Sequence, residues 1–83
     1  MSHLDEVRNI LGDVLVLNER KNGLNHDSAL LGSIPELDSM AVVNVLTALE
    51  EYFGFTVEDD EISATAFETL GTLTKFVEDK LAA

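Results

Sequence analysis

Apolar residues recur at helical spacing in three segments of this 83-residue chain. In the first segment Leu4, Val7, Leu11 and Val14 repeat every three or four residues, as they would on one face of a helix. No stretch alternates apolar and polar residues for long enough to predict a β-strand. We therefore predict an all-α fold, a small four-helix bundle of three main helices and one short helix, with a long first loop.

The first helix is predicted from Leu4 to Leu17, and a long connection, residues 18 to 37, follows it. Asn22-Gly23 is a strong turn signal within polar surroundings. Loops of this length are uncommon inside compact domains and are often functional. The connection carries scattered apolar residues, so we expect it to pack over the core. These residues are Leu24, Leu30, Leu31, Ile34 and Leu37.

The second helix is predicted from Ser39 to Phe53, and Gly54 ends it. Either Asp38 or Ser39 suits the N-cap, and from position alone capping is the favoured role of Ser39. On a wheel of about 3.6 residues per turn, one face of this helix is a continuous apolar stripe that we expect in the core. Its residues are Val42, Val45, Leu46, Leu49 and Phe53.

A second face of this helix carries Met40, Val43 and Thr47. A bundle helix usually shows polar residues to solvent on such a face, but here its first turn is apolar. Either the long loop covers Met40 and Val43, or these residues form a docking patch for partner proteins beside Ser39. We favour the docking patch. Its acidic rim is expected to comprise Glu36, Asp38, Glu50 and Glu51.

The C-terminal third is predicted to contain a short helical turn and a last helix. Phe67 and Leu70, three residues apart, indicate the turn, and Thr69 is placed to cap the helix that follows. The apolar positions of that helix recur at helical spacing. They are Leu70, Leu73, Phe76, Val77 and Leu81.

Composition narrows the function classes. The length allows one domain, residues 1–83. The formal net charge of -11 leaves no basic cluster for nucleic acid and favours basic protein partners. The absence of cysteine excludes disulfides, thiolate metal sites and a cysteine nucleophile. The start MSHLDEVRNI does not resemble a signal peptide, and no apolar stretch is long enough to span a bilayer, so we expect a cytoplasmic monomer.

Catalytic and metal chemistry find little support in the residues. A serine nucleophile needs a general base, but the only histidines, His3 and His26, lie in polar contexts, and GxSxG is absent. We therefore expect no enzyme activity and no metal site. Modification of Ser39 by another enzyme remains open, because a phosphate is favoured at a helix N-terminus. The acidic run 58–61 lacks EF-hand spacing and predicts a solvated surface, with weak divalent binding, as in a calcium sensor, as the alternative.

Three segments together resemble the acyl carrier proteins. LDSM, followed by VVNVLTALEEYFGF, is similar to the family's Asp-Ser-Leu or Asp-Ser-Met signature and second helix, and ETLGTLTKFVEDKL is similar to its last cap and helix. The resemblance implies that Ser39 carries 4′-phosphopantetheine, delivered from coenzyme A by a phosphopantetheinyl transferase. The thiol of that arm would hold acyl groups as thioesters, and basic patches on acyl-loading and acyl-processing enzymes would meet the acidic surface.

The chain also departs from the fatty-acid carriers of this family. The resemblance implies that those carriers have acidic residues early on the outward part of the second helix. Ala41 and Asn44 stand there instead, and Thr47 stands further along. We therefore expect docking to be less electrostatic and more apolar, and these departures favour a specialised stand-alone carrier over the housekeeping fatty-acid carrier. The wider expectation is a carrier for fatty-acid, lipid or specialised acyl synthesis. An amino-acyl carrier of the D-alanyl or peptidyl type, and a non-covalent interaction module with the same fold, are the alternatives. The interior either opens to shelter an acyl chain or is a simple core; its residues are Val45, Leu46, Leu49, Val57, Phe67 and Leu70.

Overall fold

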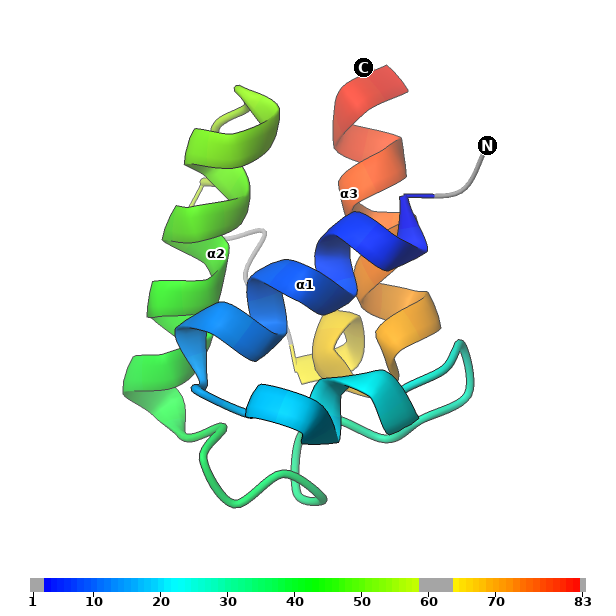
Figure 1. The fold of residues 1–83 in the computed structure, drawn as a ribbon. Coiled ribbons are helices and arrows are strands. Elements are labelled where there is room, and N and C mark those ends of the chain that lie inside the picture. The colour runs from blue at the N-terminus through cyan, green and yellow to red at the C-terminus, as the bar shows by residue number, and fades with distance from the viewer. Residues whose placement is uncertain (1–2, 59–63, 83) are drawn as a thin grey trace.

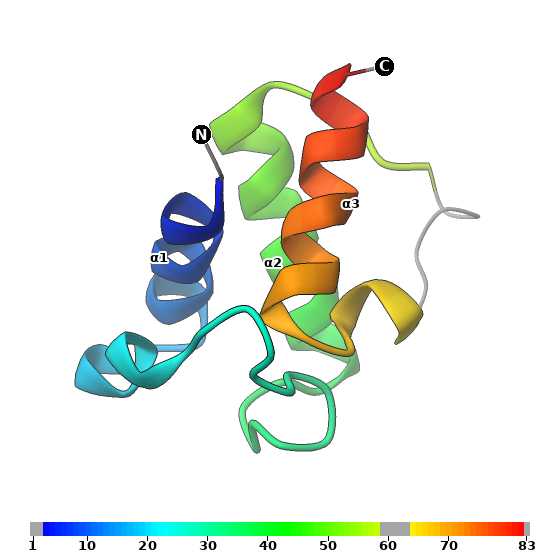
Figure 2. The ribbon, with the colours of Figure 1, turned by 90° about the vertical axis from the view of Figure 1, so that its right-hand side faces the viewer.

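The protein is a bundle of three α-helices, seen in a computed structural model that describes residues 3–58 and 64–82. The helix α1 lies across both α2 and α3, and the long loop lies at the end of the bundle where α2 and α3 begin (Figures 1 and 2). The predicted all-α bundle is confirmed. Its elements are α1 (Leu4–Val14), η1 (Asn18–Gly23), α2 (Ser39–Phe53), η3 (Ala64–Phe67) and α3 (Leu70–Ala82), where η denotes a 3-10 helix.

One apolar core joins all three α-helices. Val7 of α1, Val45 and Leu49 of α2, and Leu73 and Val77 of α3 are fully buried. Val42 and Phe53, predicted in the core stripe of α2, are only partly buried but pack against this core. Within the described residues, no helix is long and apolar enough to cross a bilayer.

The first helix ends three residues earlier than predicted, at Val14 rather than at Leu17. Leu15 and Leu17 are both buried. On an α-helix, residues i and i+2 point in directions about 200° apart, so a continued helix would expose one of these two leucines. The chain instead turns at Val16, which has a positive φ of 53° and an exposed side chain. The polar segment that contains Asn22-Gly23, predicted as a turn, then forms η1, a short helix that the periodicity did not indicate.

The long loop is bound to the start of α3 through its backbone. The N–H groups of Leu30 and Leu31 donate to the carbonyls of Glu68 (3.0 Å) and Phe67 (2.9 Å). In return, the Leu70 N–H donates to the Ser28 carbonyl over 3.0 Å. As predicted, the loop covers the core, since Leu30, Ile34 and Leu37 are buried and Leu24 packs against them, whereas Leu31 is exposed.

Thr69 caps α3, as the sequence predicts. Its hydroxyl oxygen accepts the Thr72 N–H over 3.0 Å, and the Thr72 hydroxyl oxygen accepts the Thr69 N–H over 3.0 Å. Each threonine thus satisfies one backbone donor of the other, in the manner of a capping box. The short turn differs from its predicted position, because η3 ends at Phe67 and Leu70 already belongs to α3.

Removal of this cap should destabilise the protein. We expect Thr69→Ala to lower the free energy of unfolding by about 1 kcal/mol, because the Thr72 N–H loses its partner. Urea denaturation followed by circular dichroism measures the change. Thr56→Ala, at an exposed threonine outside the helices, is the control and should stay within about 0.5 kcal/mol of the parent. Equal losses in both variants would contradict the capping role.

Candidate functional site

Ser39 begins α2, but Asp38 caps it. The Asp38 carboxylate accepts the Ala41 N–H over 2.8 Å, and the Asp38 carbonyl accepts the Val42 N–H over 2.9 Å. The exposed Ser39 hydroxyl therefore has no capping duty, and it makes no hydrogen bond to the described residues. Because the first N–H groups of a helix have no partner within it, an anion bound to this oxygen would meet favourable donors.

Ser39 lies on the edge of a cavity of about 490 Å³, which we call the Ser39 groove. Its walls come from the long loop, the first turn of α2 and η3. The lining residues are Leu31, Asp38, Ser39, Val42, Val43, Ala64 and Phe67. Apart from Asp38 and Ser39 these side chains are apolar. A long apolar group attached at Ser39 thus has a surface of matching chemistry beside it.

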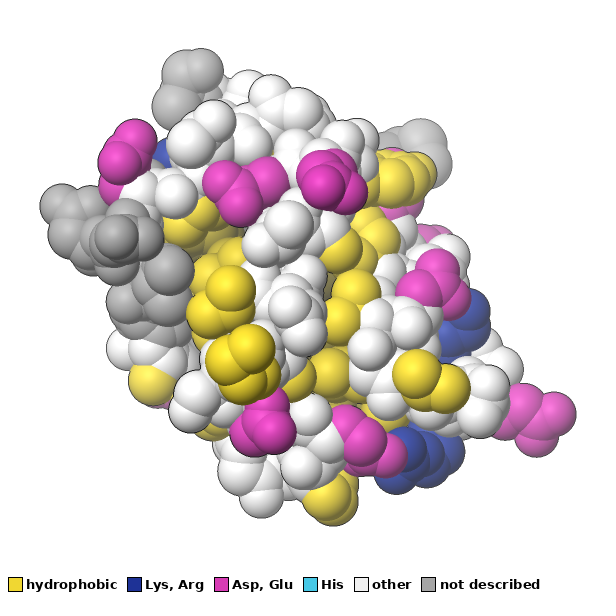
Figure 3. Space-filling view, turned by 90° about the vertical axis from the view of Figure 1, so that its left-hand side faces the viewer, with side chains coloured by type: hydrophobic (Ala, Val, Ile, Leu, Met, Phe, Trp, Pro, Cys, Tyr) yellow, Lys and Arg dark blue, Asp and Glu magenta, His cyan; other side chains and the backbone are white. Residues whose placement is uncertain are grey.

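The apolar face of α2 is open to solvent beside Ser39. The side chains of Met40 and Val43 are 70% and 49% exposed, so the alternative in which the long loop covers them is wrong. Figure 3 shows hydrophobic side chains gathered over this side of the molecule, with acidic groups around them. The patch is therefore a surface feature and not part of the core.

Most of the predicted acidic rim already has partners within the chain. Glu36 pairs with Arg20 of η1, and Asp38 is the cap of α2. Glu50 accepts the Val57 N–H over 2.8 Å and so binds the segment that follows α2. Glu51 is exposed. The rim thus presents less free charge than its composition suggests.

Of the three uncharged positions expected on the outward surface of α2, one lies elsewhere. Ala41 is buried, so it is not on the outward surface of α2, and its lack of charge says nothing about partner recognition. Asn44 is exposed, as expected. Thr47 is exposed too, and its hydroxyl donates to the Val43 carbonyl over 3.0 Å. The argument from absent acids on this surface therefore rests on Asn44 and Thr47.

The histidines lie elsewhere. The backbone N–H of His3 donates to the Glu78 carboxylate over 3.1 Å, and its ring meets Phe53 edge-on at 5.5 Å. The ring of His26 contacts Asp27. Neither histidine lines the Ser39 groove. Among the described residues no group of three or more acidic or histidine side chains is arranged for a metal ion, and residues 59–61 of the acidic run lie outside the described residues.

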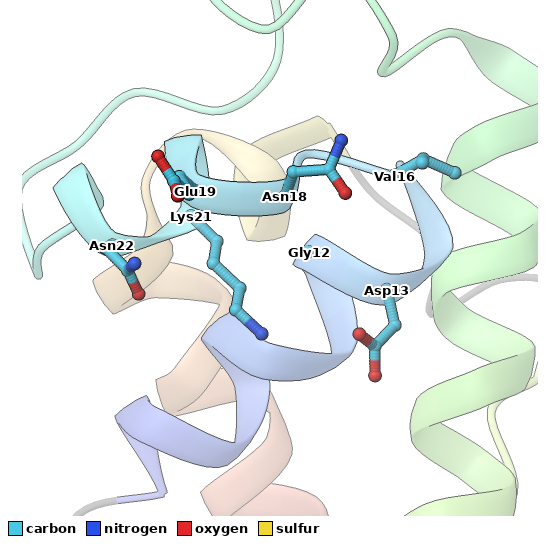
Figure 4. A pocket seen from close by; sticks show the side chains of 7 residues that line it. All are labelled: Gly12, Asp13, Val16, Asn18, Glu19, Lys21 and Asn22. Carbon is cyan, nitrogen blue, oxygen red and sulfur yellow. The ribbon is translucent and has the colours of Figure 1, made fainter.

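A separate cavity of about 460 Å³ lies between the end of α1 and η1 (Figure 4). It is lined mainly by polar side chains, and Lys21 runs along the backbone of Gly12 there. The aliphatic part of Lys21 covers this helix surface, in the manner of a long charged side chain that buries its stem. Ser39 does not line this cavity, and we assign no chemistry to it.

Comparison with known proteins adds to this geometry. Residues 5–77 match the model of the family described as "Phosphopantetheine attachment site". The solution NMR structure of a holo acyl carrier protein from Nitrosomonas europaea is 71% identical, and the match covers all of both chains with a TM-score of 0.93. No curated protein sequence matches the chain.

The Arg20–Glu36 pair makes a pH-dependent contribution to stability. The hydrogen bond from the Arg20 guanidinium lowers the pKa of Glu36 below its usual 4.5. This contribution is therefore present above pH 4.5 and is lost as the pH falls through the lowered pKa. We expect Glu36→Gln to reduce the midpoint of thermal unfolding at pH 7, with the difference from the parent disappearing in acid. Glu51→Gln removes an equal charge without an ion pair, and a similar pH-dependent loss there would contradict this role.

Proposed function

The chain belongs to the acyl carrier proteins, and we propose that Ser39 is the residue to which its 4′-phosphopantetheine is attached. Proteins of this family are carriers and not enzymes. The attached arm supplies a terminal thiol that holds acyl groups as thioesters. A chain without cysteine thereby gains a thiol, and Ser39 contributes the oxygen that bears the arm.

The observation that carries this assignment is the exposed Ser39 hydroxyl at the start of α2, with the capping role taken by Asp38. A serine that caps its helix would have to give up a hydrogen bond when modified, whereas Ser39 does not. The positive end of α2 favours the phosphate that joins the arm to the serine. A transferase could reach a buried serine only after local unfolding, whereas the exposed Ser39 is accessible in the folded chain.

The Ser39 groove supports an acyl cargo rather than an amino-acyl cargo. Leu31, Val42 and Phe67 offer apolar contacts, and among the described residues Asp38 is the only charged one that lines it. The free ammonium of an amino-acyl group would lose hydration against such walls, whereas a hydrocarbon chain gains roughly 0.8 kcal/mol for each CH₂ removed from water. We therefore place the chain in fatty-acid, lipid or specialised acyl synthesis.

We further propose that the docking patch receives the transferase and the acyl-processing enzymes. Exposed Met40 and Val43 flank Ser39 in the first turn of α2, so an enzyme that reaches the arm contacts them. Glu51 and Thr47 lie further along the helix, and Glu36, Asp38 and Glu50 complete the rim. Since several of these acids have partners within the chain, apolar contact should contribute more to docking than charge.

The remaining assignments follow from composition and the single core. We infer that residues 1–83 form one carrier domain, because α1, α2 and α3 share one cluster of buried side chains. The net charge of -11 favours solubility and mutual repulsion, which supports a monomer in the cytoplasm that meets basic protein surfaces.

Incubation with coenzyme A, magnesium and a broad-specificity phosphopantetheinyl transferase should add one phosphopantetheine mass to the chain. Ser39→Ala should abolish the addition, because no other oxygen stands in the same place. Intact-mass spectrometry measures both. Ser33→Ala, at an exposed serine in the loop, is the matched control and should be modified like the parent. A parent chain that stays unmodified with several transferases would instead support the non-covalent interaction module.

Met40→Lys should weaken docking without loss of the fold, because the side chain is exposed and its apolar surface contacts partners in this proposal. We expect roughly a tenfold rise in the transferase KM, which corresponds to about 1.4 kcal/mol. Steady-state kinetics with the apo protein measures it. Thr56→Lys makes a similar charge change away from Ser39, and an equal rise in that variant would argue for charge alone.

A further inference from the structure

We propose that the cleft between α1 and α2 is a second docking surface, which receives a basic amphipathic helix of a partner protein. We call this cleft the α1–α2 groove, and its volume is about 330 Å³. It does not include Ser39, and the proposal goes beyond attachment of the arm. Its lining residues are Ile10, Asp13, Val14, Ala48, Glu51 and Tyr52.

The floor of the α1–α2 groove is apolar and is not closed over by the rest of the fold. Val14 and Ala48 pack against the core but are only partly buried, and Tyr52 is 60% exposed. Interaction with the Glu6 carboxylate of α1 raises the pKa of the Tyr52 hydroxyl, and the Tyr52 ring meets Phe53 edge-on at 4.8 Å. Exposed tyrosines with a fixed polar end are typical anchors of protein interfaces.

Charge selects the occupant. Asp13 of α1 and Glu51 of α2 both line the groove, and none of the five lysines and arginines of the chain does. Arg8 bonds to Asp5 and Arg20 to Glu36, so these cations do not neutralise the walls. Acidic walls repel nucleic acid and anionic lipid headgroups, and they attract lysines and arginines.

The shape of the site indicates a helical occupant. A cleft between two α-helices with an apolar floor takes the apolar face of a third helix, with anchors at i, i+3, i+4 and i+7. Basic residues at the edges of that face would meet Asp13 and Glu51. In Figure 3 hydrophobic side chains follow the hollow beside α2, with acidic groups on both sides.

Val16, two residues beyond Val14, provides an independent observation. It is a β-branched residue with a φ of 53°, and its side chain is 67% exposed. The left-handed conformation costs a residue other than glycine roughly 1–2 kcal/mol. An exposed apolar side chain in such a conformation adds little to folding. Val16 lines the separate cavity between α1 and η1, which shares Asp13 with the α1–α2 groove, so it adds apolar surface beside that end of the groove.

The place of the groove on α2 separates its occupant from the arm. Ala48 follows Ser39 by nine residues, which is about 13 Å along a helix. A helix bound there leaves Ser39 and the Ser39 groove open. A partner is therefore able to hold the carrier through the α1–α2 groove while another enzyme acts on the cargo.

The test uses the whole apo chain and a fluorescent peptide of about 15 residues, built from leucine and lysine at amphipathic helical spacing. A peptide of the same composition in scrambled order is the control for attraction by charge alone. Fluorescence anisotropy measures affinity, and amide chemical shifts locate the site. We expect the amphipathic peptide to bind at least tenfold more tightly, with the largest shifts at Val14, Ala48 and Tyr52.

Variants then separate the groove from the rest of the surface. Ala48→Arg and Asp13→Lys should each weaken peptide binding by roughly tenfold. Glu68→Lys makes the same charge change as Asp13→Lys at another exposed position and should weaken binding no more than about twofold. Circular dichroism checks the fold, and if Ala48→Arg unfolds, Asp13→Lys alone decides.

Three results would overturn the second docking surface. These are equal binding of both peptides, equal losses for Asp13→Lys and Glu68→Lys, and shifts centred on Met40 and Val43. The last result would assign the peptide to the docking patch. Ser39→Ala should bind the peptide like the parent, so the outcome is independent of phosphopantetheine attachment.

Discussion

The backbone hydrogen bonds between the long loop and the start of α3 determine the geometry of the whole functional end. The first N–H groups of α3 have no partner inside their helix, and the loop supplies carbonyls to two of them, Ser28 to Leu70 and His26 to Gly71 (2.8 Å). The same pairing turns Leu30 into the core and leaves Leu31 on the Ser39 groove. Without it the groove would lose one wall.

Neighbouring residues at the start of α2 have different structural roles. Asp38 takes the cap, which leaves the Ser39 hydroxyl exposed, and Met40 faces solvent while Ala41 enters the core. Each of these roles follows from the helical step of about 100° per residue, which turns successive side chains to different surroundings. In the function that we propose, attachment, docking and folding therefore use adjacent positions without competing for the same side chain.

The sequence predicted the helices and the place of Ser39 at the start of α2 well, because periodicity and caps are local signals. It predicted α2 from Ser39 to Phe53 and the Thr69 cap correctly. The capping role favoured for Ser39 from position alone is wrong, since Asp38 is the cap. The sequence-based prediction was wrong where packing between distant parts of the chain determines the local structure. The end of α1 is an example, because burial of both Leu15 and Leu17 ends the helix. The pairing of Glu36 with Arg20 was likewise hidden, because sixteen residues separate them and no local pattern links them. Because such pairings occupy several of its carboxylates, the predicted acidic rim presents less free charge than the sequence suggested.

The high negative charge acts at long range, and the apolar surfaces act on contact. A net charge of -11 attracts basic partners in general, so the overall charge does not distinguish one basic partner from another. Discrimination then depends on surfaces whose shape and apolar content differ. Met40 and Val43 form an exposed apolar patch beside Ser39, whereas Val14 and Ala48 line the α1–α2 groove. With the arm on Ser39, as we propose, enzymes that process it would approach the patch, whereas a partner in the α1–α2 groove would not need to reach the arm.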